Sequence, residues 1–368
     1  MRTCDLFCRV IDNFGDAGIA WRLGLSLSRE CGWNVRLIID DIATLAAFVP
    51  EVDARRDAQT VDSIGIVRWN DAFERTIGEA ADVVIEAFSC YLPDAYEEAI
   101  ARANETRQVR VVALDYLTAE SYAEESHGLL SPHPRFGYPK TFVFPGFTPK
   151  TGGIIYEADL RERIRFDGSR RQEILSGVGA DPSHPFTLFF FTYPTTPVET
   201  LVRSLAADPR PIQVILAPGE ASDTFARTYE ALGSPEHVRI VRAPMVPQKA
   251  FDGLLQSVDC ALVRGEDSVM RAQLVGTPLL WTLYPQTEET HVVKLRAFAR
   301  LYQEHLPETA QAPWMAMELG LNRGDLNPSA WSDWRDRLDE MRLGATSWQR
   351  YLFSQSSLTE RLVRLLHV

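Results

Sequence analysis

Long basic runs and long apolar runs are both missing from this sequence. No cluster of lysine and arginine occurs, and the formal net charge of the 368 residues is -12 at pH 7. Proteins that bind the phosphate backbone of nucleic acids need a basic stripe, so this class is excluded. No apolar stretch approaches the roughly 20 residues of a membrane span, and the first residues contain Asp5 and lack a small-residue cleavage site. We therefore expect a soluble chain that binds neither nucleic acid nor membrane.

Cysteine is scarce, and its spacing excludes two kinds of site. The five cysteines, Cys4, Cys8, Cys31, Cys90 and Cys260, are odd in number and scattered. They form neither a disulfide framework nor the closely spaced pairs of a zinc site. Most lie in or beside apolar segments, as reduced core thiols do. A reducing, cytoplasmic location is the prediction.

Apolar runs that resemble strands alternate with helical patterns along most of the chain. This alternation predicts parallel sheets with crossover helices, and 368 residues with 45% hydrophobic content suffice for two such α/β domains. The predicted strands of the first half are 6–11, 35–39, 64–69, 83–85 and 109–114, with a helix at 94–103. Those of the second half are 186–191, 212–216, 238–241, 260–263 and 279–283, and the tail 331–368 is helical in pattern.

Residues 116–153 interrupt the alternation with many prolines and glycines. Such punctuation predicts surface loops that end the first domain. Gly152 and Gly153 close this segment, and we predict a hinge there from the glycines alone.

Two carboxylates, Asp12 and Asp16, lie four residues apart directly after the first predicted strand. Apolar residues then recur with a spacing of four, which predicts a helix from about Ala17. Ligands bind at the carboxyl ends of strands in open α/β sheets, so this loop is a candidate acid/base site. The structural alternative is that Asp16 is an N-cap and Asp12 closes an Asx-turn. The nearby glycines do not meet the G-x-G-x-x-G spacing, so a nicotinamide cofactor is not supported.

A second candidate site lies where strand 260–263 passes into the next helix. Ser268 is predicted to cap that helix, whose first N–H groups would face a diphosphate, and Arg264 adds a fork of donors. Glu266 and Asp267 would repel phosphate, so we expect them to accept hydrogen bonds from sugar hydroxyls or to hold a cation. The structural alternative is an acidic first helical turn with a surface arginine.

Other residues could complete a nucleotide site. Tyr193 is predicted to reach a cleft and stack on a base, while most of the preceding phenylalanine run is core. Gln248 can read a pyrimidine edge through its amide, although an ordinary helix start explains it nearly as well. Glu288, His291 and His127 lack the spacing of a specific metal site, so no metal is predicted.

The residues of several segments are similar to those of one family, the protein-arginine rhamnosyltransferases that modify bacterial translation elongation factor P. These segments are IDNFGD at 11–16, VIEAF at 84–88, FPGF at 144–147, KTGG at 150–153, VRGEDSVMRAQ at 263–273, and YPQ at 284–286 with His291. The resemblance implies a GT-B glycosyltransferase fold of two Rossmann-like, doubly wound domains facing a cleft. With the sequence pattern, it divides the chain into an acceptor-side domain at 1–153, a nucleotide-sugar domain at 154–345, and a C-terminal helix within 346–368 that packs back on the first domain.

The resemblance also implies an activity and a set of site residues. The activity is inverting transfer of rhamnose from the co-substrate dTDP-β-L-rhamnose to an arginine of elongation factor P, without a metal or other cofactor. Asp16 as base, Asp12 and Glu266 are the expected catalytic residues. The expected donor-binding residues are Asn13, Phe14, Gly15, Tyr193, Gln248, Phe251, Arg264, Gly265, Asp267, Ser268 and Tyr284.

Two other functions stay open at the level of sequence. One is a different GT-B enzyme, such as a nucleotide-sugar epimerase or a transferase with a small acceptor. The other is a non-catalytic module that binds a nucleotide or a partner protein, with the two aspartates serving only as turn and cap.

Overall fold

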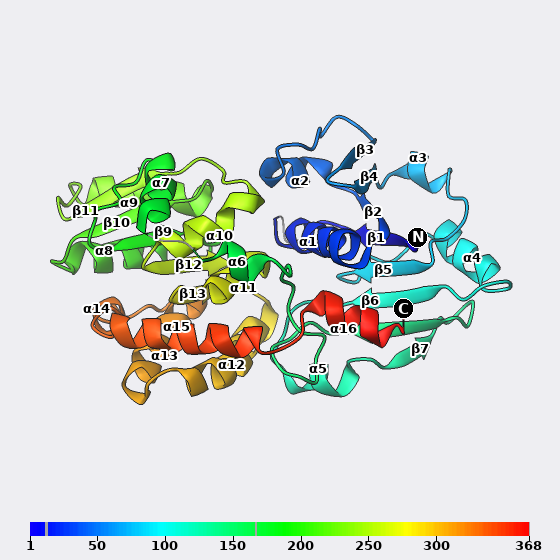
Figure 1. The fold of residues 1–368 in the computed structure, drawn as a ribbon. Helices are drawn as coiled ribbons and strands as arrows, with labels where there is room; N and C mark the ends of the chain where they lie inside the picture. The colour runs from blue at the N-terminus through cyan, green and yellow to red at the C-terminus, as the bar shows by residue number, and fades with distance from the viewer. Residues whose placement is uncertain (12–13, 166–167, 368) are drawn as a thin grey trace. The chain divides into compact units, whose positions relative to one another are not determined.

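The computed structural model describes residues 1–11, 14–165 and 168–367, which form two compact units. Unit 1 comprises Met1–Leu160 and Gln355–Val368, and unit 2 comprises Arg161–Ser354 (Figure 1). The predicted domain boundaries after residues 153 and 345 therefore lie before the structural boundaries, which follow residues 160 and 354. The predicted C-terminal segment is also divided, because its first residues end a helix of unit 2 and only the remainder joins unit 1.

Unit 1 is built on a sheet of eight described strands in the order β3-β4-β2-β1-β5-β6-β8-β7. Its central strands are parallel, and the pairs β3–β4 and β7–β8 at the two edges are antiparallel. The strands are β1 (Thr3–Cys8), β2 (Asn34–Ile39), β3 (Ala58–Val61), β4 (Ile64–Arg68), β5 (Val83–Ala87), β6 (Arg110–Leu114), β7 (Leu130–Pro132) and β8 (Pro139–Val143). The helices are α1 (Phe14–Cys31), α2 (Ile42–Phe48), α3 (Asp71–Glu74), α4 (Asp94–Ala103), α5 (Ser121–Ser126) and α16 (Leu358–Leu365).

Unit 2 contains a parallel sheet of five described strands in the order β11-β10-β9-β12-β13. The strands are β9 (Thr187–Phe190), β10 (Ile212–Leu216), β11 (Val238–Arg242), β12 (Cys260–Arg264) and β13 (Leu279–Thr282). The α-helices after the boundary-spanning α6 (Leu160–Arg163) are α7 (Gly168–Gly177), α8 (Val198–Ala207), α9 (Glu220–Ala231), α10 (Gln248–Ser257), α11 (Asp267–Val275), α12 (Thr290–Tyr302), α13 (Glu308–Arg323), α14 (Ala330–Arg335) and α15 (Leu338–Phe353). Short 3₁₀ turns, η1 (Thr287–Glu289) and η2 (Gln303–His305), flank α12.

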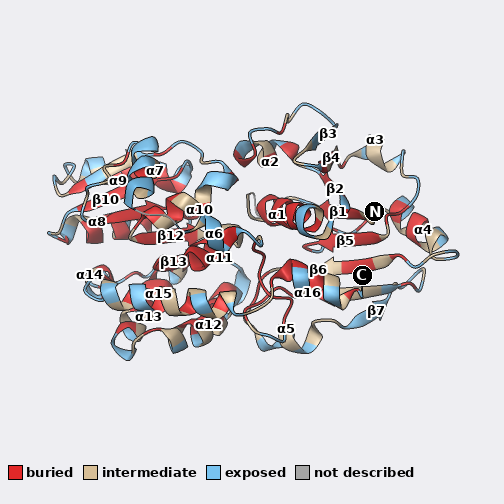
Figure 2. Cartoon of the chain, viewed as in Figure 1, coloured by how far each residue is buried: buried red, intermediate tan, exposed pale blue. Residues whose placement is uncertain are grey.

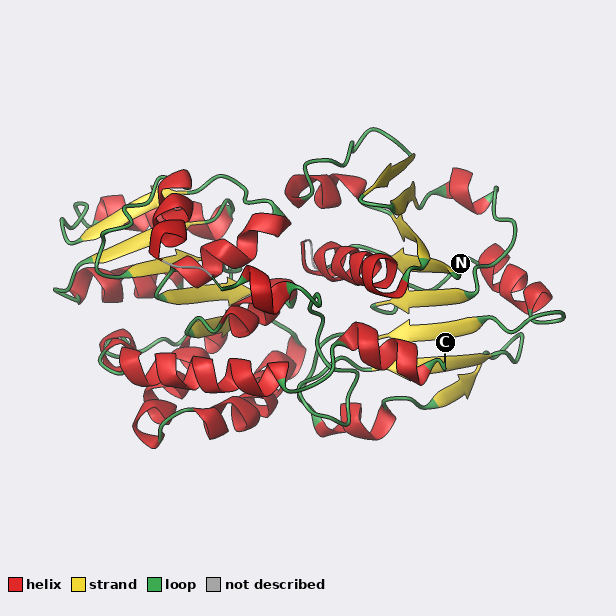
Figure 3. Cartoon of the chain, in the orientation of Figure 1, coloured by secondary structure: helices red, strands yellow, loops and turns green. Residues whose placement is uncertain are grey.

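The strands at the centre of each sheet are buried along most of their length (Figure 2). Parallel strands covered on both faces read as nearly continuous apolar runs, which is why the sequence predicted them. Helices and strands alternate through both units (Figure 3). This confirms the predicted α/β class with doubly wound sheets.

Two predicted segments differ from the structure. The first strand begins at Thr3 rather than at residue 6, because the charge of Asp5 is paired inside the sheet. Arg36 of β2 donates to both carboxylate oxygens of Asp5, at 2.7 and 2.5 Å, and the Tyr96 hydroxyl donates to the same group. The segment 116–153 is not all loop, since β8 pairs with β6 and carries β7 at its edge.

The C-terminal segment is fastened to unit 1 through the 148–156 region. Arg361 donates to the carbonyl oxygens of Thr148 and Thr151 at 2.8 and 2.7 Å. Gly153 has a φ of +74°, and a Cβ there would lie 2.9 Å from the Ser356 carbonyl oxygen. These glycines therefore permit close packing inside unit 1, and the predicted hinge at Gly152 and Gly153 is wrong.

Candidate catalytic and donor-binding residues

The acidic loop of unit 1 follows β1, the strand between β2 and β5. Helix α1 begins at Phe14, earlier than predicted, so Asp16 is the third helical residue and not an N-cap. Its side chain is buried, and its Oδ2 accepts a hydrogen bond from the Ile11 N–H at 2.8 Å. Asp12 and Asn13 lie outside the described residues.

Three residues near Asp16, namely Phe14, Gly15 and Cys8, show what surrounds its side chain. The Phe14 ring meets Phe48 of α2 edge to face at 6.2 Å, so it packs within unit 1. Gly15 is half-buried in the first turn of α1. Burial, followed by the nearby charge of Asp16, raises the pKa of the Cys8 thiol well above its ordinary value. Cys8 is therefore a protonated core thiol rather than a nucleophile.

The end of β5 is a feature that the sequence reasoning did not single out as a site. Cys8 and Ala87 are register partners, so the segment after β5 starts beside the loop that carries Asp16. Phe88, Ser89 and Tyr91 all have positive φ, between 50° and 57°. Left-handed conformations of residues other than glycine cluster at functional sites, so this turn joins the candidate site. The VIEAF motif, which carried the resemblance, was the available sequence indication.

In unit 2 the turn between β12 and α11 brings together the predicted donor-site residues. Arg264 ends β12, Gly265 has a φ of 66°, and Glu266 takes the N-cap position of α11 without a side-chain cap. The prediction that Ser268 caps this helix is therefore wrong, because α11 starts at Asp267, two residues earlier than a helix capped by Ser268 would. Trp281 Nε1 donates to the Gly265 carbonyl oxygen at 3.0 Å and holds the turn against β13.

The Arg264 guanidinium lies over two aromatic rings. Its Cζ is 4.6 Å from the ring centroid of Phe191 and 4.9 Å from that of Tyr193. Tyr284 meets Tyr193 edge to face at 5.5 Å. Tyr193 is only 5% exposed whereas Tyr284 is 65% exposed, so Tyr284 presents the open aromatic surface that was expected of Tyr193.

The acidic residues beside Arg264 have polar partners. Lys294 of α12 donates to Glu266 Oε1 at 2.9 Å, so this carboxylate holds a cation that belongs to the chain itself. Gln248 Nε2 lies 3.4 Å from Asp267 Oδ2, which joins the start of α10 to the start of α11. Lys294 was missed from the sequence because it lies on a different helix, with no motif around it.

Phe251 and its neighbour Asp252 have structural contacts. The Phe251 ring meets Phe189 edge to face at 5.8 Å, as part of the packing of α10 on β9. Asp252 is buried and accepts from the Arg271 guanidinium at 2.6 and 2.5 Å and from Arg163 at 3.1 Å. Asp252 therefore fixes α10 to α11, the helix that follows the turn.

No group of three or more His, Cys, Asp or Glu residues within the described ranges could hold a metal ion. His127 belongs to unit 1, where its Nδ1 accepts from the Phe144 N–H at 3.3 Å. His291 belongs to unit 2 and is bonded to backbone groups there. The structure does not bring the two histidines together within one unit.

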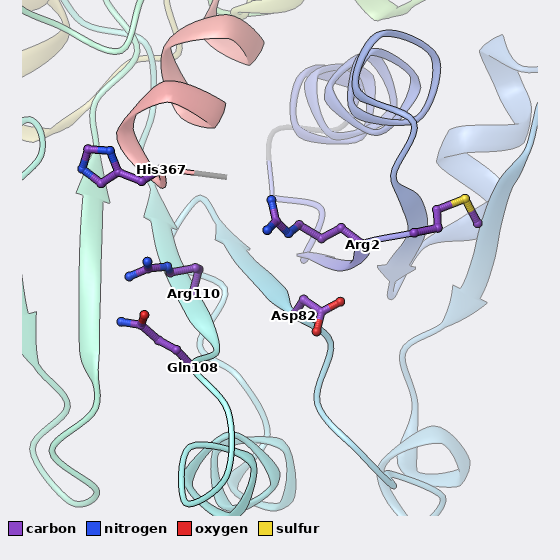
Figure 4. A pocket seen from close by; sticks show the side chains of 6 residues that line it. Arg2, Asp82, Gln108, Arg110 and His367 are labelled. Atoms are coloured by element: carbon purple, nitrogen blue, oxygen red, sulfur yellow. The ribbon is translucent and has the colours of Figure 1, made fainter.

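A surface pocket of unit 1 lies at the opposite ends of the strands from Asp16. It is lined by Met1, Arg2, Asp82, Gln108, Arg110 and His367 (Figure 4). Arg2 precedes β1 and Arg110 begins β6, so the pocket is at the amino ends of these strands. It contains none of the predicted site residues.

The family of the chain is decided by a match over nearly its whole length. A family model described as the elongation factor P (EF-P) rhamnosyltransferase EarP matches residues 4–367. The chain belongs to the EarP family. A protein-arginine rhamnosyltransferase of Neisseria meningitidis serogroup B, strain H44/76, is 36% identical over 377 residues, covering 98% of this chain and 95% of the relative.

Solved structures agree with the EarP assignment. One, described as the structural basis for EarP-mediated arginine glycosylation of translation elongation factor EF-P, is 27% identical with a TM-score of 0.66, and the match covers 100% of this chain and 99% of the other. A UDP-glucosyltransferase from Polygonum tinctorium, 12% identical, matches with a TM-score of 0.56 over 100% and 99% of the two chains and supports the fold alone. The protein is thus an enzyme of the protein-arginine rhamnosyltransferase type with a GT-B fold. None of its described helices is long and apolar enough to cross a membrane.

Proposed function

We propose that this EarP-family enzyme transfers L-rhamnose from dTDP-β-L-rhamnose to one arginine side chain of translation elongation factor P, with inversion at the anomeric carbon. The observation that carries the proposal is the EarP match over residues 4–367. The solved EarP structure concerns arginine glycosylation of EF-P, which supports the same acceptor here. The five free cysteines are consistent with the cytosol, which stays a prediction.

The β12–α11 turn is suited to a nucleotide diphosphate. The Arg264 guanidinium offers several N–H donors in a plane, the geometry that binds phosphate oxygens in pairs. The first N–H groups of α11 and the positive end of its dipole favour the negative charge that develops on departing dTDP. Tyr193 and Tyr284 supply aromatic surface next to this guanidinium. We therefore expect the leaving group to be stabilised without a metal.

The acceptor poses a protonation problem. The pKa of a guanidinium lies roughly 10 units above that of an ordinary aspartate, so complete proton transfer before attack would cost about 13 kcal/mol. The proton must therefore leave while the new bond forms. As the arginine nitrogen bonds to the anomeric carbon, the bond from that carbon to the phosphate oxygen breaks, and dTDP departs with the electron pair.

We assign the base to Asp16, which accepts the proton late in this step, while Asp12 and Glu266 help to fix the guanidinium. The Ile11 N–H and the start of α1 hold the Asp16 carboxylate in place. The experiment is intact-mass analysis of the host's elongation factor P after incubation with the enzyme and dTDP-β-L-rhamnose. We expect the mass of one deoxyhexose, an α-linked sugar by NMR, and undiminished transfer in excess chelator.

The matched variants are Asp16→Asn and Asp41→Asn, because both residues are acidic and lie at the start of a helix that follows a parallel strand. Asp41 caps α2 and accepts from the Thr44 N–H at 3.0 Å. Asp16→Asn can keep the bond from Ile11 but not the base, so kcat should fall by roughly 10²–10⁴-fold. Asp41→Asn should leave kcat unchanged. Near-normal kcat in Asp16→Asn would remove this residue as the base, and a wild type that adds no deoxyhexose would remove the proposed reaction.

A further inference from the structure

Side chains of helix α13 in unit 2 make hydrogen bonds to the backbone at the outer edge of strand β13. The strand lies at the end of the sheet, with β12 as its neighbour. Both carboxyl oxygens of buried Glu318 lie within hydrogen-bond distance of the Trp281 N–H, at 3.0 and 3.2 Å. Asn322, one turn later, accepts from the Leu283 N–H at 2.8 Å and donates to the Trp281 carbonyl oxygen at 2.7 Å. The end of β13 is thus fixed by one helix.

His291 extends this fixation to the loop that follows β13. Its Nε2 lies 3.0 Å from the Asn322 carbonyl oxygen, and its Nδ1 lies 3.2 Å from the Gln286 backbone nitrogen. A carbonyl oxygen only accepts and a backbone N–H only donates, so the ring carries its proton on Nε2 and accepts at Nδ1. The neutral ring therefore bridges α13 and the loop.

The loop needs such anchors because its backbone is strained. Glu288 and Glu289 both have positive φ, 57° and 54°, which residues other than glycine seldom adopt. Arg323, at the end of α13, adds an ion pair to Glu289 at 3.2 Å. The loop is therefore tied to α13 at its start, its middle and its end.

The residue that this loop presents is Tyr284. Its ring is largely exposed and meets Tyr193, the ring over which the Arg264 guanidinium lies. His291 links α13 to the Gln286 backbone, and Gln286 lies two residues after Tyr284 in the same loop. Tyr284 in turn contacts the aromatic surface beside Arg264. A shift of the loop would move Tyr284, the residue that the loop contributes to that surface.

We infer that His291 is a positioning residue, which holds Tyr284 in place for binding of the nucleotide-sugar donor. The inference rests on the proposed function, because it concerns the donor of that reaction. It assigns His291 a role through the Gln286 backbone and no contact with the reacting atoms.

Two substitutions separate the two hydrogen bonds of the ring. In His291→Asn the amide oxygen takes approximately the place of Nδ1 and can still accept from Gln286. In His291→Gln the amide nitrogen takes approximately the place of Nε2 and keeps the bond to Asn322, but the acceptor for Gln286 is lost. His305→Gln is the matched control, since half-buried His305 also makes a hydrogen bond within unit 2, to Ser347 Oγ at 2.9 Å, and lies outside the loop.

The first measurement is hydrogen exchange of the Gln286 amide in the absence of substrates. We expect faster exchange in His291→Gln, and exchange close to that of wild type in His291→Asn and His305→Gln. The second is steady-state transfer, in which His291→Gln should raise the donor KM about five- to tenfold, the effect of one hydrogen bond. Its kcat and its KM for the protein acceptor should change little, and His291→Asn should restore the donor KM.

A double-mutant cycle with Tyr284→Ala tests whether His291 acts through Tyr284. If it does, His291→Gln adds nothing to the donor KM once the tyrosine is gone. Unchanged Gln286 exchange, or an additive effect on the donor KM, overturns the positioning role even in a fully active enzyme. A wild type without transfer activity would instead refute the proposed function, and the exchange measurement would then decide the structural part by itself.

Discussion

Replacing Arg264 by lysine keeps the positive charge beside α11 and removes the planar group that lies over Phe191 and Tyr193. Each cation–π contact at a partly exposed site is worth roughly 0.5–1 kcal/mol. Loss of one charge-assisted hydrogen bond of a paired phosphate contact costs about 1.5–3 kcal/mol. Lysine itself keeps part of both interactions, so we expect a net loss near 2 kcal/mol, or about 30-fold in kcat/KM for the donor. Arg264→Met also removes the charge and should lose roughly a further 30-fold.

The assay is the initial rate of deoxyhexose transfer over a range of dTDP-β-L-rhamnose concentrations, with thermal unfolding measured on every variant. Arg242→Met is the matched control, because Arg242 ends β11 at the far edge of the same sheet and makes an exposed ion pair with Asp223 at 2.7 Å. Its kcat/KM should stay within about twofold of wild type, since exposed ion pairs contribute little. If Arg264→Met bound and used the donor as well as Arg242→Met does, the diphosphate role of Arg264 would be refuted.

Two further substitutions test stability. Gly153→Ala places a Cβ 2.9 Å from the Ser356 carbonyl oxygen at a φ of +74° and should lower the free energy of unfolding by about 1–3 kcal/mol in urea titrations. Gly78→Ala, with open space around it, should not, and equal values for the two variants would contradict the close packing at Gly153. Burial raises the pKa of the Glu318 carboxyl well above its ordinary value. The contribution of this carboxyl to stability is therefore fully present below its unfolded-state pKa and is lost as pH rises through its raised folded-state pKa. Wild type should therefore lose stability relative to Glu318→Gln as pH rises from 5 to 9, and parallel stability curves would contradict this account.

Most central strands could be predicted because strands that are buried in a parallel sheet have mostly apolar sequences. The strands at 35–39 and 212–216 are mostly apolar, with Arg36 and Gln213 as their single polar residues, and buried strands of a parallel sheet show such near-continuous apolar runs. The start of β1 could not be predicted in this way, since Asp5 looks polar until Arg36 and Tyr96 are known to pair with it. Strand β8, which lies between β6 and the edge strand β7, was hidden for a related reason, because it begins with a proline and lies among turn residues.

The two strand-to-helix turns that carry candidate residues were predicted from the sequence, and their exact geometry was predicted less well. Strand-to-helix turns follow from local periodicity, so the turns at Asp16 and Arg264 were found. The first residue of each helix was misplaced by two or three positions, since a helix start depends on which groups meet its first N–H donors. Lys294 and Asn322 were not found at all, because their roles come from elements far along the chain that only the folded structure brings to the turn.

Each turn follows the carboxyl end of a parallel strand, and the two place side chains of opposite charge, Asp16 and Arg264, next to that end. In unit 1 the helix after β1 places the Asp16 carboxylate in its first turn, where the helix dipole and the Ile11 N–H stabilise an anion. In unit 2 the strand before α11 ends on a guanidinium. An anion suits a cationic arginine acceptor, whereas a cation suits a departing nucleotide diphosphate. The same stabilisation makes Asp16 a poor base for a free guanidinium, so its proton can be taken only as the bond to the sugar removes positive charge from the nitrogen. The placement of Asp16 therefore favours a concerted displacement over any path that first makes a neutral arginine.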